Sequence, residues 1–200
     1  MIGPKGSGKS TIAKRLAHRT NMEVLNFDRF LAHAGLNPDD YDDEEATMAL
    51  VKNLIHETSP RILIEDFPRN EQQARLFIRN CVTPTEVFSI KCSKDICQER
   101  ILDLGEEHKS YISSAMLTQS IKRYNELSGP LVHFLKQATP GSFREINGEQ
   151  GIENVMREVY AVVEPTVIHV RNGVQGAEEL RSSIIKELTS PRWGYFNLDV

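Results

Sequence analysis

The sequence has little of several features that would assign it to a specialised class. Its 200 residues include three cysteines and no CxxC pair, which argues against a disulfide framework and against a zinc site. No apolar run approaches the ~20 residues that a membrane-spanning helix needs, and no signal peptide is recognisable. There is no dense basic patch, and 24 Lys and Arg against 28 Asp and Glu give a net charge of −4. We therefore expect a cytoplasmic protein without nucleic-acid or membrane partners.

A glycine-rich phosphate-binding motif is present. Residues 3–10 read Gly-Pro-Lys-Gly-Ser-Gly-Lys-Ser and match GxxxxGK[ST] at every required position. The glycines let successive backbone N–H groups point into one concavity, at the start of a helix whose dipole favours anions. We predict that ATP binds Gly3, Pro4, Lys5, Gly6, Ser7, Gly8, Lys9, Ser10 and Thr11. Lys9 is the predicted catalytic residue for the β- and γ-phosphates, and the Ser10 hydroxyl is a predicted ligand of Mg²⁺.

Short apolar segments alternate with helical patterns along the rest of the chain. Strands are expected at Val24–Phe27, Ile62–Ile64, Val87–Ile90 and Phe143–Ile146. Helices are expected at Thr11–Arg19, Ala46–Ile55, Glu71–Ile78, Ser93–Leu104, Ser113–Leu127, Leu131–Gln137 and Ile152–Val163. This alternation predicts an α/β fold with a parallel sheet of about five strands and helices on both faces.

The first strand of that sheet is expected to be truncated, because only Met1 and Ile2 precede the glycine-rich motif. The centre of the sheet is then either open or filled by another segment, for which Val167–Val170 is the candidate. The strand at Ile62–Ile64 ends in Glu65 and Asp66. A carboxylate there suits Mg²⁺ coordination, so Ser10 and Glu65 are the predicted metal ligands.

From Glu65 to Ala74 the sequence resembles the adenylate kinases and other nucleoside monophosphate kinases, which are P-loop kinases. In that family this strand ends Asp-Gly-Phe-Pro-Arg, with a glutamine four residues after the arginine. This chain has Glu65-Asp66-Phe67-Pro68-Arg69 and Gln73 at that offset. A guanidinium suits bidentate phosphate contact. The resemblance covers most of residues 1–163.

The resemblance implies a role for three further side chains. Arg69 would grip the acceptor monophosphate and act with Lys9 in catalysis, Gln73 would read the acceptor base, and Arg100 would pack on the adenine of ATP. It also implies Mg-ATP as the phosphoryl donor and a nucleoside monophosphate, with AMP favoured, as the acceptor.

Two segments depart from the family pattern. Asn26 and Leu31 stand where the family has a threonine and an arginine that bind the acceptor. The lid, Leu104–Ser114, lacks the family's arginines, and no arginine occurs from Ile101 to Lys122. An arginine contact on the transferring phosphoryl group can contribute ~10³–10⁵ in rate, so weakened activity is expected. An acidic cluster lies between Leu31 and the lid, and it is interpreted as a solvated loop and helix start. Its members are Asp39, Asp40, Asp42, Asp43, Glu44 and Glu45.

Two domains are predicted. Residues 1–163 form the adenylate-kinase-like nucleotide-binding domain, and residues 164–200 begin a degenerate, truncated second repeat. In the second segment a predicted strand, Thr166–Val170, leads to Gly173 and Gly176 as the first leads to Gly3 and Gly6. Glu178 and Glu179 stand where Gly8 and Lys9 would be, and a carboxylate there would repel phosphate. Two unrelated βα units are the alternative.

Three functions remain open at this point. The first is a nucleoside monophosphate kinase-type phosphotransferase with weakened activity. The second is a catalytically impaired nucleotide-binding module whose partners are other repeats of a longer tandem-repeat chain; such repeats of this family occur in ciliary and flagellar proteins. The third, a small-metabolite kinase, is disfavoured by Phe67-Pro68-Arg69 with Gln73, which points to a nucleotide acceptor.

Overall fold

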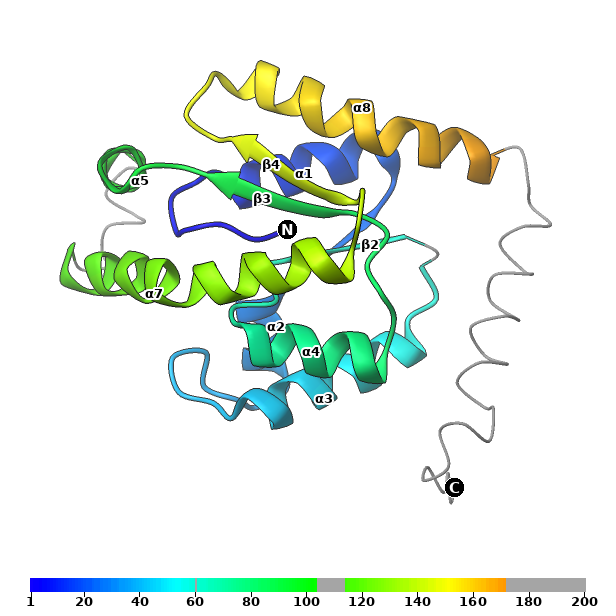
Figure 1. Cartoon of the computed structure of the whole chain (residues 1–200), viewed down its shortest axis with the longest axis horizontal. Coiled ribbons are helices and arrows are strands. Elements are labelled where there is room, and N and C mark those ends of the chain that lie inside the picture. Colours follow the sequence, from blue (N-terminus) through cyan, green and yellow to red (C-terminus); the bar gives the residue numbers. More distant parts are fainter. Residues whose placement is uncertain (60, 104–113, 172–200) are drawn as a thin grey trace. The chain divides into compact units, whose positions relative to one another are not determined.

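The computed structural model describes residues 1–59, 61–103 and 114–171 (Figure 1). Within them the elements, in chain order, are α1 (Lys9–Thr20), β1 (Glu23–Asn26), α2 (Phe27–His33), α3 (Asp43–His56), β2 (Ile62–Glu65), α4 (Glu71–Asn80), β3 (Val87–Lys91), α5 (Lys94–Leu102), α7 (Ser114–Ala138), β4 (Phe143–Asn147) and α8 (Ile152–Arg171). The chain divides into two compact units, Met1–Tyr160 and Ala161–Val200. No helix in these ranges is both long and apolar enough to cross a membrane.

The strands form two parallel pairs, β1 with β2 and β3 with β4, and Met1 and Ile2 connect them. On one side the Met1 amine donates to the Ile64 carbonyl at 2.7 Å, and the Asp66 N–H donates to the Met1 carbonyl at 3.0 Å. On the other side the Ile2 N–H donates to the Phe88 carbonyl, and the Ile90 N–H donates to the Ile2 carbonyl. The predicted parallel α/β fold is confirmed. The described residues contain four regular strands, and Met1 and Ile2 lie between the two pairs, where a fifth was expected from the sequence.

Helices cover both faces of this sheet. In Figure 1, α1 and the beginning of α8 lie on one side of the strands, and α4 and α7 lie on the other. Apolar residues of α1 recur at helical spacing, and Ile12, Ala13 and Leu16 are buried. Arg15 of α1 forms an exposed ion pair with Glu153 of α8 at 2.6 Å.

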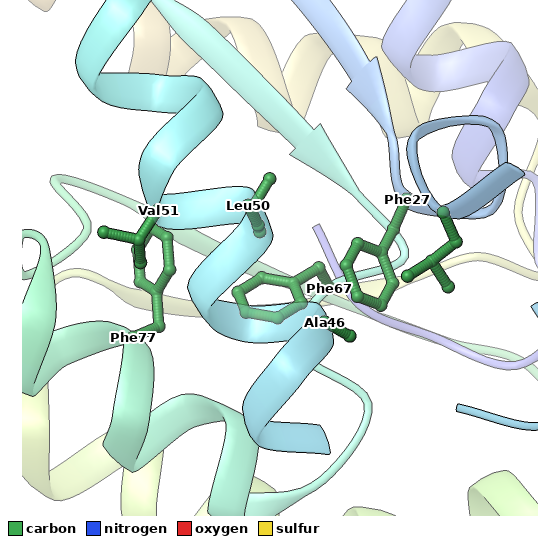
Figure 2. Packing of buried hydrophobic residues seen from close by; sticks show 7 residues of the cluster. Phe27, Ala46, Leu50, Val51, Phe67 and Phe77 are labelled. Atoms are coloured by element: carbon green, nitrogen blue, oxygen red, sulfur yellow. The ribbon is translucent and has the colours of Figure 1, made fainter. Parts of the chain in front are cut away.

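An aromatic cluster holds the segment that follows β2. The ring of Phe67 is buried, with its centroid 4.8 Å from that of Phe27 and 5.2 Å from that of Phe77. Figure 2 shows these rings beside Leu50 of α3. Because Phe67 stands between Asp66 and Arg69 in the sequence, its burial fixes the backbone that carries both charged residues.

Three helices differ from the sequence prediction. α2 was not predicted: the Asn26 side chain accepts the Arg29 N–H at 3.1 Å and caps a helix that begins at Phe27, the expected last residue of a strand. α7 is one helix with Pro130 inside it, rather than two. α8 continues through Pro165 to Arg171.

The strand predicted at Thr166–Val170 is therefore wrong, and so is its role as filler of the sheet centre. These residues lie in α8. Their β-branched side chains favour a strand locally, but extending an existing helix adds a hydrogen bond for each residue fixed, so propagation outweighs a weak local preference. The predicted glycine turn and the two glutamates of the second repeat lie outside the described residues, as does the lid apart from Ser114.

Candidate nucleotide-binding site

The glycine-rich loop adopts the expected form between Ile2 and α1. Gly6 has φ +88°, and a Cβ at this position would lie 2.4 Å from the Cys97 carbonyl oxygen. Only glycine fits such a close approach at positive φ. α1 begins at Lys9 with Gly8 as its N-cap and no side-chain cap. The N–H groups of its first turn therefore have no intrahelical partner and are oriented for an anion.

Lys9 is buried, and its ammonium group is fully engaged. The Nζ donates to the carbonyl oxygens of Gly3 at 2.7 Å and Pro4 at 2.9 Å, and it forms an ion pair with Asp66 at 3.2 Å. An ammonium has three donors, so each has a protein partner. Lys9 thus lies at the loop, as the motif requires, but a phosphate must displace one of these partners to bind it.

The two predicted metal ligands lie side by side, although they are 55 residues apart in the sequence: Ser10 is in α1 and Glu65 ends β2. The Ser10 hydroxyl donates to Glu65 Oε1 in a short hydrogen bond. Glu65 is buried at the end of β2. A hydroxyl and a carboxylate beside a phosphate-binding loop provide oxygen donors that fit Mg²⁺. In proteins this ion usually has only one or two protein ligands, and phosphates of the substrate and water complete its coordination. The described residues contain no group of three or more His, Cys, Asp or Glu arranged to hold a metal by themselves.

Asp66 is a residue of the site that sequence reasoning did not assign. It has φ +66°, the left-handed region, at the place where the resembling family has glycine. One oxygen pairs with Lys9 at 3.2 Å and the other with Arg69 at 2.8 Å. Burial alone would raise the pKa of Asp66, but the charges of Lys9 and Arg69 outweigh it and lower that pKa to about 2. Asp66 is therefore ionised at neutral pH.

Arg69, the predicted acceptor-binding residue, is also engaged by protein groups. Its Nη2 donates to Asp28 in a short bond and to Asp66 at 2.8 Å. Its Nε donates to the Asp66 carbonyl at 3.3 Å, and its Nη1 lies 3.4 Å from the Pro38 carbonyl and 3.5 Å from the Tyr41 hydroxyl. Burial would lower its pKa, but Asp66, Tyr41 and Asp28 raise it above the usual range.

Gln73 lies beside Arg69 and is fully buried. Its Oε1 accepts the Arg69 N–H at 2.8 Å, and its Nε2 donates to Asp43 at 2.7 Å and to the Tyr41 hydroxyl at 3.2 Å. In this arrangement Gln73 offers no open group to a base. Its predicted role in reading the acceptor base stays a prediction, and it requires Tyr41 and Asp43 to move.

Arg100 lies on α5, the helix that contacts the glycine-rich loop at Gly6 through Cys97. Its Nη1 is 3.8 Å from the Sγ of Cys92. The position beside the loop is compatible with a contact to the adenine, which stays a prediction.

The positions that depart from the family pattern have structural roles. Asn26 caps α2, and Leu31 is fully buried in the aromatic cluster. Part of the acidic cluster is also structural rather than merely solvated. Asp42 caps α3 by accepting the N–H groups of Glu44 and Glu45, each at 2.9 Å. Asp43 is the carboxylate that engages Gln73.

Comparisons with known proteins agree with this geometry. A family model described as an AAA domain matches residues 1–119. The chain is 22% identical to an adenylate kinase of Nitrobacter hamburgensis over 200 aligned residues, which cover 84% of this chain and 92% of that protein. It is 24% identical to a uridylate kinase of Saccharomyces cerevisiae, with 80% and 86% covered. It is 21% identical to human adenylate kinase isoenzyme 5, with 92% of this chain covered but 36% of that protein.

The family match, the loop with Lys9 and Ser10, and the parallel strands on either side of it describe one architecture. The relatives that align over most of the chain carry the names of nucleotide kinases. The chain therefore belongs to the AAA domain family, as a P-loop protein of the adenylate kinase type.

Proposed function

We propose that this protein is a nucleoside monophosphate kinase-type phosphotransferase that moves the γ-phosphoryl group of Mg-ATP to a nucleoside monophosphate. The observation that carries the proposal is that Lys9 and Arg69 lie on either side of the same carboxylate. Lys9 Nζ is 3.2 Å from Asp66 Oδ1, and Arg69 Nη2 is 2.8 Å from Asp66 Oδ2. A donor phosphate on Lys9 and an acceptor phosphate on Arg69 would be neighbours, which is what direct transfer between them requires.

Each residue has a distinct part in this proposal. The loop N–H groups and Lys9 bind the β- and γ-phosphates of ATP, and Arg69 orients the acceptor phosphate. Ser10 and Glu65 hold Mg²⁺, which neutralises phosphate charge when bound. The side chains supply positioning and charge neutralisation, and no covalent intermediate with the protein is needed. AMP is the favoured acceptor, because adenylate kinases are among the relatives, although a uridylate kinase is too.

A second function is favoured by a specific observation. Every donor of Lys9 and Arg69 already has a protein partner, and Gln73 is buried and fully bonded. This arrangement also suits a module that binds nucleotide weakly and does not turn it over. As such a module, the chain would act within a longer protein, with residues 1–163 as one of its repeats. The long human relative, of which the alignment covers 36%, supports this possibility.

Turnover with defined acceptors tests the proposal. ADP formation from Mg-ATP is measured with AMP, CMP, UMP and GMP, for the wild-type chain and for Lys9→Ala and Arg69→Ala. We expect turnover that depends on one acceptor. It should fall by about 10²-fold or more in each variant, because each variant lacks a positive charge that stabilises the phosphates during transfer. The matched control is the surface variant Arg75→Ala, which also removes one positive charge but breaks only an exposed ion pair with Glu71. It should retain full activity.

Two results would contradict the kinase proposal. ATP hydrolysis that ignores every acceptor would exclude monophosphate transfer. Lys9-dependent binding of Mg-ATP with no turnover on any acceptor would favour the binding module instead.

A further inference from the structure

One carboxylate connects the two cations of the candidate site. Asp66 Oδ1 pairs with Lys9 at 3.2 Å, and Asp66 Oδ2 pairs with Arg69 at 2.8 Å. No other acidic side chain in the described part of the chain pairs with both of these cations. In the proposed function the donor phosphate presents its oxygens to Lys9 and the acceptor phosphate presents its oxygens to Arg69, so Asp66 lies where anions of the substrates would be expected.

The backbone at Asp66 makes this placement unusual. Its φ of +66° lies in the left-handed region, which residues other than glycine seldom occupy because the Cβ then lies close to the backbone. A glycine, as in the resembling family, would avoid that close approach and leave the anion position empty. This chain instead has a side chain there whose two oxygens pair with the two cations.

The pairing also accounts for the saturation of both cations. Lys9 has two loop carbonyls as its other partners, and Asp66 supplies the third. The Arg69 guanidinium donates two of its five hydrogen bonds to Asp66, one to the carboxylate and one to the backbone carbonyl. Without the carboxylate, Lys9 and Arg69 would each have a donor directed toward the space between them.

We propose that Asp66 is a resident anion that occupies the space between Lys9 and Arg69, and that it weakens nucleotide binding because a donor phosphate must take Lys9 from it and an acceptor phosphate must take Arg69 from it. This inference rests on the proposed function, since it assumes that phosphates bind at Lys9 and Arg69. Asp66 acts on the reaction through these two residues and is a positioning residue.

The electrostatic consequence applies to any polyphosphate that binds at the glycine-rich loop. When Mg-ATP binds, the Asp66 carboxylate loses its ion pair with Lys9 but stays close to the phosphate that replaces it. Like charges held this close repel each other, and the repulsion is strong in a partly buried site. Removing the charge should therefore tighten the binding of any polyphosphate at the loop, with or without a base.

The experiment compares Asp66→Asn and Asp66→Gly with the wild-type chain by titration calorimetry. The probes are Mg-ATP and Mg-tripolyphosphate, the second of which has no base or sugar. We expect both variants to bind both probes about tenfold more tightly or better, as expected for relief of like-charge repulsion. Asn tolerates positive φ and Gly is relaxed there, so the two variants separate the charge effect from the backbone effect.

A matched control changes the net charge by the same amount elsewhere. Glu153→Gln removes one negative charge from an exposed ion pair with Arg15, and the dissociation constants should stay within about twofold of wild type, because exposed pairs are screened. Circular dichroism and urea unfolding establish that each variant is folded. Arg69→Ala in the Asp66→Asn background should remove part of the gain, because one of the two released cations is then absent.

The outcomes separate the two proposals. If the wild-type chain binds Mg-ATP through Lys9 and the Asp66 variants bind no tighter, or more weakly, the resident-anion proposal is overturned while the proposed function stands. If neither wild type nor variant binds either probe, both proposals fail. Binding that appears only after Asp66 is replaced supports the resident anion most directly.

Discussion

The ionised Asp66 makes the stability of the nucleotide-free protein dependent on acid pH. Its pKa is about 2 in the folded chain against an ordinary 3.8, so its stabilisation is fully present above pH ~4 and is lost as the pH falls toward 2. We expect the free energy of unfolding of wild type to fall by about 2 kcal/mol more than that of Asp66→Asn between pH 5 and pH 2.

Urea unfolding at a series of pH values measures this difference. The other carboxylates are common to both chains, so their contributions cancel in the comparison. Parallel curves for wild type and Asp66→Asn over this range would mean that Asp66 is not paired in the folded protein.

Gly6 and Gly8 provide a second test, which separates the cost of a steric clash from the cost of backbone strain. Both have positive φ, +88° and +94°, but a Cβ at Gly6 meets the Cys97 carbonyl at 2.4 Å, whereas a Cβ at Gly8 meets nothing within 4 Å. Gly8→Ala should cost about 1–2 kcal/mol of stability from strain. Gly6→Ala should cost more than that, because α5 must also move. Urea unfolding of both variants measures the difference, and equal losses would contradict the close approach.

The sequence predicted the loop residues from one local motif, and it predicted Ser10 and Glu65 as ligands of Mg²⁺. The structure places these two side chains in hydrogen-bond contact, and their roles as ligands stay predictions. The engagement of Arg69 and Gln73 could not be predicted. It depends on Asp28, Tyr41 and Asp43, which are 28 to 41 residues away from their partners along the chain. Asp66 belongs to the motif after β2, but no role was predicted for it, because the sequence does not show that Lys9 lies beside it.

Helix α3 offers a prediction about an element that leads into the acceptor side of the site. Asp42 accepts two N–H groups of its first turn. Asp42→Ala should lower the free energy of unfolding by about 1 kcal/mol, the usual value for a lost N-cap. The neighbouring exposed Asp40 is the control, since Asp40→Ala changes the same charge and should stay within about 0.5 kcal/mol of wild type. Equal losses in the two variants, measured by urea unfolding, would show that charge rather than capping matters.

The elements show where local patterns were sufficient and where they were not. β2 and β3 are short, mostly apolar segments, whereas β4 has two apolar residues, Phe143 and Ile146, among polar ones. Each of the three was located to within one residue. α2 was missed because its apolar residues continue directly from β1 and the Asn26 cap looks like an ordinary strand residue. Thr166–Val170 was misassigned because strand propensity was read without the helix that precedes it.

The site in the first compact unit draws on both strand pairs. Asp66 and Arg69 follow β2, whereas α5, which packs on Gly6, follows β3. The glycine-rich loop itself begins directly after Ile2, the residue that connects the pairs. A nucleotide on this loop would therefore contact segments that belong to both halves of the sheet.

The narrow connection at Met1 and Ile2 has a consequence for amide hydrogen exchange. The N–H groups of Ile2, Asp66 and Ile90 form the bonds between the two strand pairs, so their exchange reports any separation of the pairs that is short of global unfolding. We expect saturating Mg-ATP, at about 100 times its dissociation constant, to slow exchange at these three amides by up to about 100-fold. Amides within β1 and β2, away from the connection, should be affected less. Uniform slowing across both pairs would mean that the sheet opens only when the whole domain unfolds.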